Sequence, residues 1–210
     1  MKSMLDNIEV FIQSSIKFNR DLKIYFDPFR IENNYNDADI IFITHSHYDH
    51  LSAYDINKVK MDTTIVVAPS SISKDLEGLD LEVFLVEPNE SYQVKNISFE
   101  TVRAYNNTKE FHPISNNWVG YIITLDNTRY YIAGDTDMTP DNESIKCDVA
   151  FIPIGGKFTC DAVEAANLTN KIKPKVVVPI HYGSIIGTKE DENKFVNLVN
   201  PDIECSILLK

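Results

Sequence analysis

The chain has 210 residues, 43 % of them hydrophobic and 24 % charged, which is ordinary for one globular domain. Its formal net charge of −11 leaves no broad basic face for a nucleic-acid backbone. Its three cysteines are widely spaced, which excludes a disulfide framework, and no apolar run approaches membrane-spanning length.

Asp6 and Glu9 interrupt the N-terminal segment, which therefore lacks the apolar centre of a signal peptide. We expect a single domain over residues 1–210, located in the cytoplasm, with no nucleic-acid partner and no membrane insertion.

Short runs rich in β-branched and aromatic residues predict most of the regular structure. Residues 8–18 and 97–105 alternate in part, as half-buried strands do, whereas residues 40–44 and 175–180 are almost wholly apolar, as strands buried on both faces are. The complete set of predicted strands is 8–18, 22–26, 40–44, 64–68, 81–86, 97–105, 118–125, 129–134, 149–154, 175–180 and 204–209.

Three helices are predicted between these strands from their first residues. Ser52 followed by Asp55 has the pattern of a capping box, and Asp161 followed by Glu164 repeats it ahead of a helix that ends before Pro174. Thr188 can cap a third helix, which Pro201 ends. Strands with helices between them predict the α/β class.

The segment "THSHYDH", residues 44–50, concentrates three of the five histidines at the end of a predicted strand. Alternate residues of an extended chain point the same way, so His45 and His47 can bind one ion. The turn that follows can direct Asp49 and His50 towards a second position. Imidazole and carboxylate groups suit zinc, and also iron or manganese. The alternative is a histidine-rich surface turn beside a sheet.

Three further candidate ligands also lie next to predicted strands. His112 precedes the strand at 118–125, Asp135 follows the strand at 129–134, and His181 follows the strand at 175–180. Ends of neighbouring strands are where sites gather in α/β sheets, so this distribution favours a metal site over a surface turn.

The order of these residues, HxHxDH followed by His, Asp and His, resembles the signature of the metallo-β-lactamase-fold hydrolases over nearly the whole chain. The segments "IYFDPF", "AYNNTKEFHP", "FIPIGG" and "KPKVVVPIHYG" resemble one branch, the small metal-dependent hydrolases related to ascorbate-phosphate lactonase and, more distantly, to N-acyl-phosphatidylethanolamine phospholipase D. The resemblance implies a four-layer αββα sandwich of two mixed β-sheets flanked by helices.

The resemblance also implies two divalent metal ions, with zinc as the first choice and manganese or iron as the others. One ion would be bound by His45, His47 and His112, the other by Asp49, His50 and His181, with Asp135 bridging them. Hydroxide at this dinuclear site would cleave an ester, lactone or phosphodiester bond of a small molecule, with phosphorylated substrates favoured. Asp49 and Asp135 are the implied catalytic residues. Asp49 could also orient the nucleophile through its free oxygen.

Residues beside these ligands have weaker signals. Asp27 and Thr44 are candidates to orient metal ligands, although Asp27 could simply form the turn before Pro28. The candidates for substrate binding are Asn106, Lys157 and Tyr182. For Lys157 the plainer interpretation is a solvated surface lysine.

Two other functions remain open at this point. A sulfur dioxygenase of the same superfamily could use a mononuclear iron bound by His45, His47, His112 and Asp135. A non-catalytic metal-binding protein could retain the fold, although the full set of seven ligands disfavours it.

Overall fold

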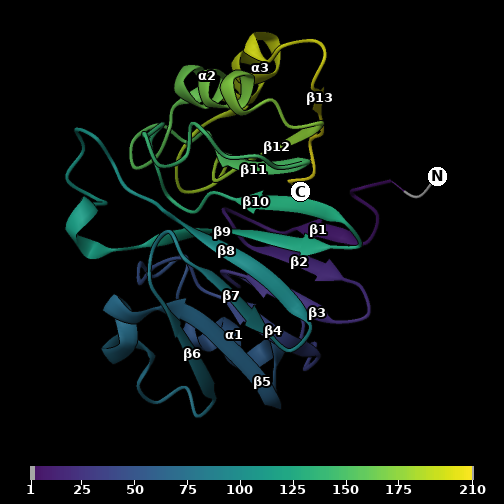
Figure 1. Ribbon diagram of the computed structural model, residues 1–210, viewed down its shortest axis with the longest axis vertical. Helices are drawn as coiled ribbons and strands as arrows, with labels where there is room; N and C mark the ends of the chain where they lie inside the picture. Colours follow the sequence, from purple (N-terminus) through teal and green to yellow (C-terminus); the bar gives the residue numbers. More distant parts are fainter. Residues whose placement is uncertain (1–2, 210) are drawn as a thin grey trace. The chain divides into compact units, whose positions relative to one another are not determined.

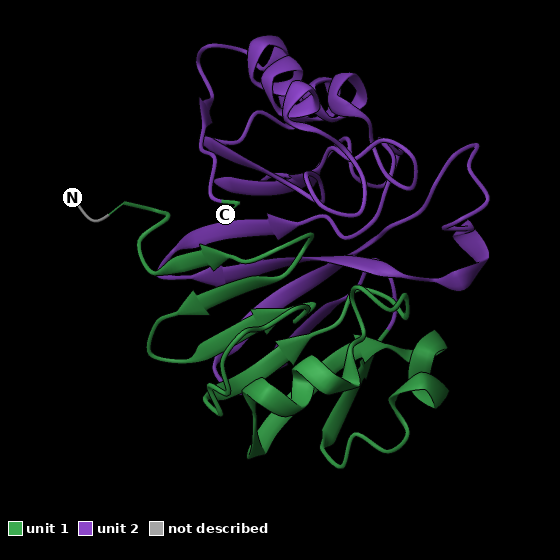
Figure 2. Ribbon diagram, turned by 180° about the vertical axis from the view of Figure 1, so that it is seen from behind, with its two compact units in different colours: residues 1–86, 209–210 green, residues 87–208 purple. Residues whose placement is uncertain are grey.

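The computed structural model describes residues 3–209, which divide into two compact units (Figure 2). Unit 1 runs up to Val86 and includes Leu209, and unit 2 is Glu87–Leu208. Each unit contains one β-sheet (Figure 1). The expectation of a single domain over residues 1–210 stays a prediction.

Unit 1 is built on a six-stranded mixed sheet in the order β1-β2-β3-β4-β5-β6. The pairs β1–β2 and β2–β3 are antiparallel, and the pairs from β3 to β6 are parallel. The elements are β1 (Ile8–Val10), β2 (Ile16–Asn19), β3 (Lys23–Phe26), β4 (Ala38–Phe42), α1 (Ala53–Val59), β5 (Lys60–Pro69), a 3-10 helix (Ser70–Leu76) and β6 (Glu82–Val86).

Unit 2 is built on a seven-stranded mixed sheet in the order β13-β12-β11-β10-β9-β8-β7. The strands from β7 to β10 pair antiparallel, and those from β10 to β13 pair parallel. The elements are β7 (Ser91–Val94), β8 (Ile97–Arg103), a 3-10 helix (Ile114–Asn116), β9 (Val119–Leu125), β10 (Thr128–Ile132), β11 (Val149–Pro153), α2 (Ala162–Ile172), β12 (Val176–Ile180), α3 (Lys189–Leu198) and β13 (Glu204–Cys205).

The three predicted helix starts are confirmed. The side chain of Ser52 accepts a hydrogen bond from the backbone of Asp55, and that of Asp161 accepts bonds from Val163 and Glu164. Thr188 and Asp191 form a reciprocal capping box at the start of α3. Helix α2 buries an alanine-rich face and packs against α3 and β11. The α/β class with two mixed sheets and helices is therefore confirmed.

The predicted strands differ from the structure in four places. Residues 8–18 form a hairpin rather than one strand, because Gln13 adopts a left-handed backbone (φ 54°) between β1 and β2. Strand β7 was missed, since its four residues are mostly exposed. Strand β5 begins at Lys60, four residues before the predicted start. Strand β13 is confined to residues 204–205, and Leu209 instead bridges to Val10 in unit 1.

Strand direction determines which loops share an edge in each sheet. In unit 1, β1, β3 and β4 run the same way, so the segments that follow them lie at one edge. In unit 2, β8 runs the same way as β10, β11 and β12, so their following loops also share an edge. These two edges carry all seven predicted ligands.

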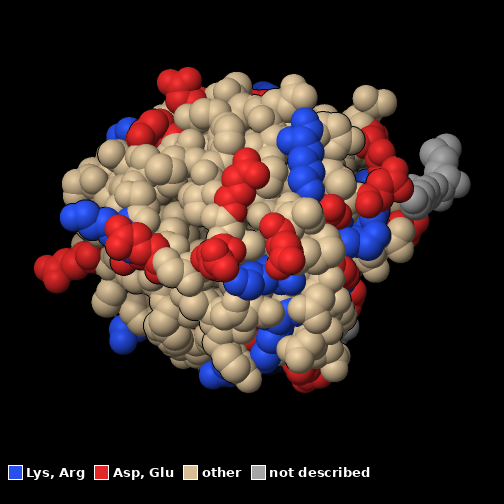
Figure 3. All heavy atoms as spheres, turned by 90° about the horizontal axis from the view of Figure 1, so that it is seen from below, with Lys and Arg blue, Asp and Glu red and all other residues tan. Residues whose placement is uncertain are grey.

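Charged side chains of both signs are interspersed on the face shown in Figure 3. Within residues 3–209, every helix is too short or too polar to cross a membrane.

Candidate metal centre

Unit 1 presents four of the predicted ligands on the loop that follows β4. The Nε2 atom of His45 lies 3.1 Å from Nδ1 of His47, and Nε2 of His50 lies 3.7 Å from Oδ2 of Asp49. His45 and His50 are fully buried, Asp49 is nearly so, and His47 is half-buried. The predicted grouping of His45 with His47, and of Asp49 with His50, is therefore present in the local geometry.

Asp27 fixes the orientation of this loop from the end of β3. Its Oδ1 accepts a hydrogen bond from the Thr44 backbone at 2.8 Å, and its Oδ2 accepts one from the Thr44 hydroxyl at 2.7 Å. The same Oδ2 lies 2.7 Å from Nδ1 of His50. Burial raises the pKa of Asp27, and the contacts with His50 and Thr44 oppose that rise. Asp27 is thus placed to hold the His50 ring with Nε2 available as a ligand.

Gln13 is a further contact of this loop that the sequence did not indicate. It is fully buried, and its Nε2 lies 3.5 Å from Oδ2 of Asp49. The left-handed backbone at Gln13 follows β1, at the same sheet edge as Asp27 and Thr44. Its sequence context, "FIQSSI", contains no glycine or proline that would have indicated a turn here.

Unit 2 brings the other three predicted ligands together. A single carboxylate oxygen, Oδ2 of Asp135, lies 3.3 Å from Nε2 of His112 and 3.2 Å from Nε2 of His181. All three residues are buried. They follow β8, β10 and β12, whose carboxyl ends share one edge of the sheet. An oxygen placed between two imidazole nitrogens is what a bridging carboxylate requires.

Asn106 sets the orientation of His112. Its Nδ2 donates to Oδ1 of Asp137 at 3.0 Å and to the carbonyl of Phe158 at 2.9 Å, which leaves Oδ1 facing Nδ1 of His112 at 3.1 Å. Because Oδ1 accepts the Nδ1 proton, Nε2 of His112 is the nitrogen available to a metal. Asp137 also accepts hydrogen bonds from the Asn107 backbone and from Lys109 Nζ.

His181 depends on a close approach by Gly155. His181 adopts a left-handed backbone (φ 57°) directly after β12. A Cβ atom added at Gly155 would lie 2.4 Å from the His181 carbonyl oxygen and 3.5 Å from its Nδ1. Any side chain at Gly155 would therefore displace the backbone of His181.

The spacing of these ligand atoms fits divalent metal ions. Ligand atoms about 2.05 Å from a tetrahedral zinc ion are about 3.3 Å from one another. The separations of 3.1 Å in the His45–His47 pair, and of 3.3 Å and 3.2 Å at Asp135, are close to that value. Oxygen partners at Asp27 and Asn106 fix the ring nitrogens on the far side of His50 and His112, as metal-binding histidines usually require.

The three candidates for substrate binding differ in their surroundings. The amide of Asn106 is engaged by His112, Asp137 and Phe158, and the buried Tyr182 hydroxyl donates to Glu192 at 2.5 Å. Lys157 is exposed, with Nζ 5.1 Å from the ring centre of Phe158. Contact of any of the three with a substrate stays a prediction.

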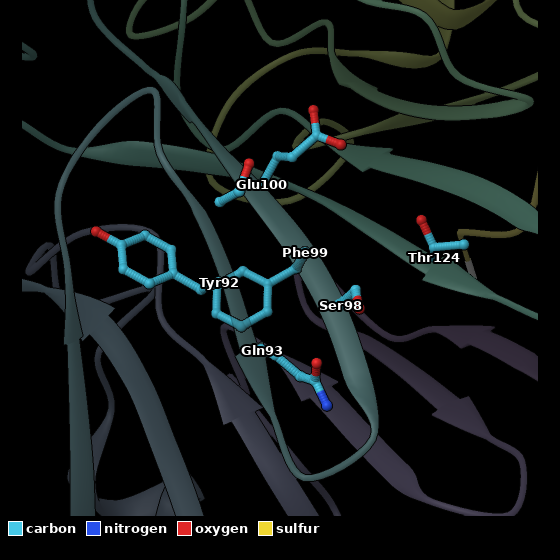
Figure 4. Close-up of a pocket in the computed structure, with 7 residues that line it drawn as sticks. Tyr92, Gln93, Ser98, Phe99, Glu100 and Thr124 are labelled. Carbon is cyan, nitrogen blue, oxygen red and sulfur yellow. The ribbon is translucent and has the colours of Figure 1, made fainter.

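A separate hollow of about 510 Å³ lies on β7, β8 and β9. Figure 4 shows Tyr92 and Phe99 side by side in its lining, and their ring centres are 5.6 Å apart. Its one ionisable carboxylate, Glu100, is paired with Arg129. The hollow contains none of the predicted metal ligands.

A family model described as "Beta-lactamase superfamily domain" matches residues 8–181, which include all seven predicted ligands. The chain belongs to the β-lactamase superfamily. It is 30% identical over 208 residues to a UPF0173 metal-dependent hydrolase of Thermococcus onnurineus, covering 89% of this chain and 88% of the relative. It is 32% identical over 211 residues to another from Saccharolobus solfataricus, covering 92% of this chain and 85% of that relative.

A solved structure from Parabacteroides distasonis has the same fold. It is 30% identical, with a TM-score of 0.83, and covers 97% of this chain and 93% of that one. The resemblance to the superfamily and its fold is therefore confirmed, and the protein is a metal-dependent hydrolase. The narrower likeness to ascorbate-phosphate lactonase stays a prediction.

Proposed function

We propose that this β-lactamase-superfamily hydrolase binds two divalent metal ions and cleaves an ester, lactone or phosphodiester bond of a small molecule. The observation that carries the proposal is Oδ2 of Asp135, which lies 3.3 Å and 3.2 Å from the Nε2 atoms of His112 and His181. The proposed ligands are His45, His47, His112 and Asp135 for one ion, and Asp49, His50 and His181 for the other, with Asp135 proposed as a ligand of both. These include every histidine in the chain.

The chemistry follows from the charge of this ligand set. When bound, two such ions lower the pKa of a shared water towards neutrality and polarise the bond to be cleaved. Five neutral imidazoles and two carboxylates would leave a formal charge of +2 on the loaded centre, which favours substrates with an anionic or carbonyl oxygen. Zinc is the first candidate for this mixture of nitrogen and oxygen ligands, with manganese and iron as alternatives.

Each carboxylate ligand has its own role in the proposal. Asp135 would bind both ions, and its Oδ2, which lies 3.3 Å from Nε2 of His112 and 3.2 Å from Nε2 of His181, supports this role. Asp49 contacts His50 through Oδ2 and is held by Gln13, so its other oxygen can orient the attacking water and accept its proton. Asp27 and Asn106 keep the rings of His50 and His112 in place while the reaction proceeds.

Metal analysis of the purified protein tests the proposal. We expect two ions per chain in the wild-type protein, reduced content in His45→Ala and Asp135→Ala, and unchanged content in Asp62→Ala, an exposed carboxylate on β5. The loaded protein should hydrolyse at least one chromogenic ester, lactone or phosphodiester, and both ligand variants should lose that activity.

Other outcomes would contradict the proposal. One iron per chain would favour the sulfur dioxygenase alternative. A protein that holds two metals but is inert towards all three substrate classes would favour non-catalytic metal binding. Absence of metal after reconstitution would remove the ligand assignment.

A further inference from the structure

Two exposed apolar side chains flank the buried ligand His112. Phe111 is 42% exposed and Ile114 is 48% exposed, whereas His112 is 1% exposed. Phe111 meets the half-buried Phe158 edge-on, with ring centres 4.6 Å apart and an interplanar angle of 89°. Exposed apolar side chains that gather into one patch can form a ligand-binding surface, whereas single exposed ones need no explanation.

A cation lies over one of these two rings, that of Phe158. Nζ of Lys157 is 5.1 Å from the ring centre of Phe158, within the range of a cation–π contact. Lys109 in the same region has its ammonium group against Asp137 and the Thr159 carbonyl. The exposed Lys157 is thus placed to meet an anion beside the two rings.

Each ring belongs to a residue that is linked to His112. Phe158 is linked through the side-chain amide of Asn106, and Phe111 through the chain itself. The carbonyl of Phe158 accepts a hydrogen bond from Asn106 at 2.9 Å, and Oδ1 of the same Asn106 lies 3.1 Å from Nδ1 of His112. Phe111 precedes His112 directly in the chain. The backbone positions that carry both rings are therefore tied to His112 within unit 2.

We propose that Phe111 and Phe158 bind an aromatic or bulky apolar group of an anionic substrate, and that Lys157 pairs with its anionic group. We call these three residues the aromatic patch. This assignment rests on the proposed function, and it narrows the substrate to an organic anion with an apolar substituent. Three side chains are too few for a stable protein interface, so the proposed occupant is a small molecule.

The test compares two phosphonates that share an anionic group and differ in their apolar part. The zinc-loaded protein is titrated calorimetrically with phenylphosphonate and with methylphosphonate. We expect phenylphosphonate to bind roughly tenfold more tightly, because an aryl contact contributes about that factor. Phe111→Ala and Phe158→Ala should each remove most of the preference, and Lys157→Gln should weaken both ligands to a similar extent.

Matched controls separate this patch from a general loss of aromatic or cationic groups. Tyr92→Ala removes a half-buried ring from the hollow in Figure 4, and Lys194→Gln removes an exposed lysine of α3. Neither should change the preference for phenylphosphonate. Metal content is measured for every variant. If Phe158→Ala loses metal, the result for Phe111→Ala decides whether the patch exists, because removing a ring that is 42% exposed should disturb the fold least.

Equal binding of the two phosphonates, binding of neither, or a preference that survives Phe111→Ala would overturn the aromatic patch. Hydrolysis is scored separately from binding. A protein that prefers phenylphosphonate but hydrolyses no ester, lactone or phosphodiester would contradict the proposed function and leave the patch standing. A protein that hydrolyses such substrates without preferring phenylphosphonate would contradict the aromatic patch and leave the proposed function standing.

Discussion

At the scale of single residues, the predicted metal ligands are oriented by partners that lie outside the ligand motif. The side chains of Asp27 and Asn106 each contact the ring nitrogen of a ligand histidine that faces away from its neighbouring ligand. Asp27 was a candidate for this role, with a simple turn before Pro28 as the alternative, whereas Asn106 was expected to bind substrate. Only the three-dimensional arrangement reveals that the Asn106 amide is engaged on both sides.

Replacing Asp27 with Asn tests the importance of this orientation. The substitution keeps the shape but changes one oxygen into a donor, which must then face either the Thr44 backbone N–H or the Thr44 hydroxyl and His50. We expect metal affinity to fall about 10- to 100-fold, measured by competition with a chromogenic chelator. Asp39→Asn, which changes a carboxylate that accepts from the Lys23 backbone, is the matched control. Affinities within threefold of each other in these two variants would contradict the role of Asp27.

At the scale of elements, the sequence predicted what periodicity and capping residues encode. Strand β12 is a continuous apolar run and β4 is apolar except for Asp39, and the caps at Ser52, Asp161 and Thr188 are short-range hydrogen bonds, so both are local signals. The hairpin at residues 8–18 was missed because its turn uses a left-handed Gln13 rather than glycine. Strand β7 depends on pairing with β8, which four largely exposed residues do not reveal.

The same limit applies to the loop that carries His112. The sequence placed this histidine before β9 but gave no conformation for residues 105–118. Asp137 holds that loop through Asn106, the Asn107 backbone and Lys109, across 28 to 31 positions of the sequence. Such long-range contacts have no local periodicity, so the sequence alone could not identify Asp137 as the residue that secures the loop.

Asp148, which directly precedes β11, contacts Arg129 in β10 and Lys175, which directly precedes β12. These contacts predict how the stability of the protein depends on pH. The Asp148 carboxylate accepts from the Arg129 backbone at 2.9 Å and pairs with Lys175 Nζ at 2.8 Å, and these contacts lower its pKa. A lowered pKa in the folded state stabilises the protein above the unfolded-state value of about 3.9, and this contribution is lost as pH falls through the folded-state pKa. We therefore expect Asp148→Asn to lower the free energy of unfolding at pH 7.

The difference between wild type and Asp148→Asn should shrink as pH falls below about 4. Urea unfolding at a series of pH values measures it, with Asp62→Asn on β5 as the exposed control. A difference that stays constant down to the acid limit would mean that packing, rather than the carboxylate charge, accounts for the effect.

At the scale of the whole molecule, the proposal couples metal binding to folding. The formal net charge of −11 favours uptake of cations, and ligands supplied by residues far apart in sequence bind an ion only when the chain is folded. Each ion present at about 100 times its dissociation constant adds about 2.7 kcal/mol to the free energy of unfolding. For a chain of this length that corresponds to a rise of about 5–11 °C in Tm.

Thermal unfolding of the metal-free protein, with and without added zinc, checks this prediction. His47→Ala in unit 1 and His181→Ala in unit 2 should each reduce the zinc-dependent rise in Tm, because the proposal makes each of these histidines a ligand of one ion. Asp62→Ala should keep the full rise. Fluorescence of Trp118, the one tryptophan of the chain, follows unit 2, and far-UV circular dichroism follows both units. If His47→Ala left the rise intact, the loop after β4 would contribute no ligand and the dinuclear assignment would fail.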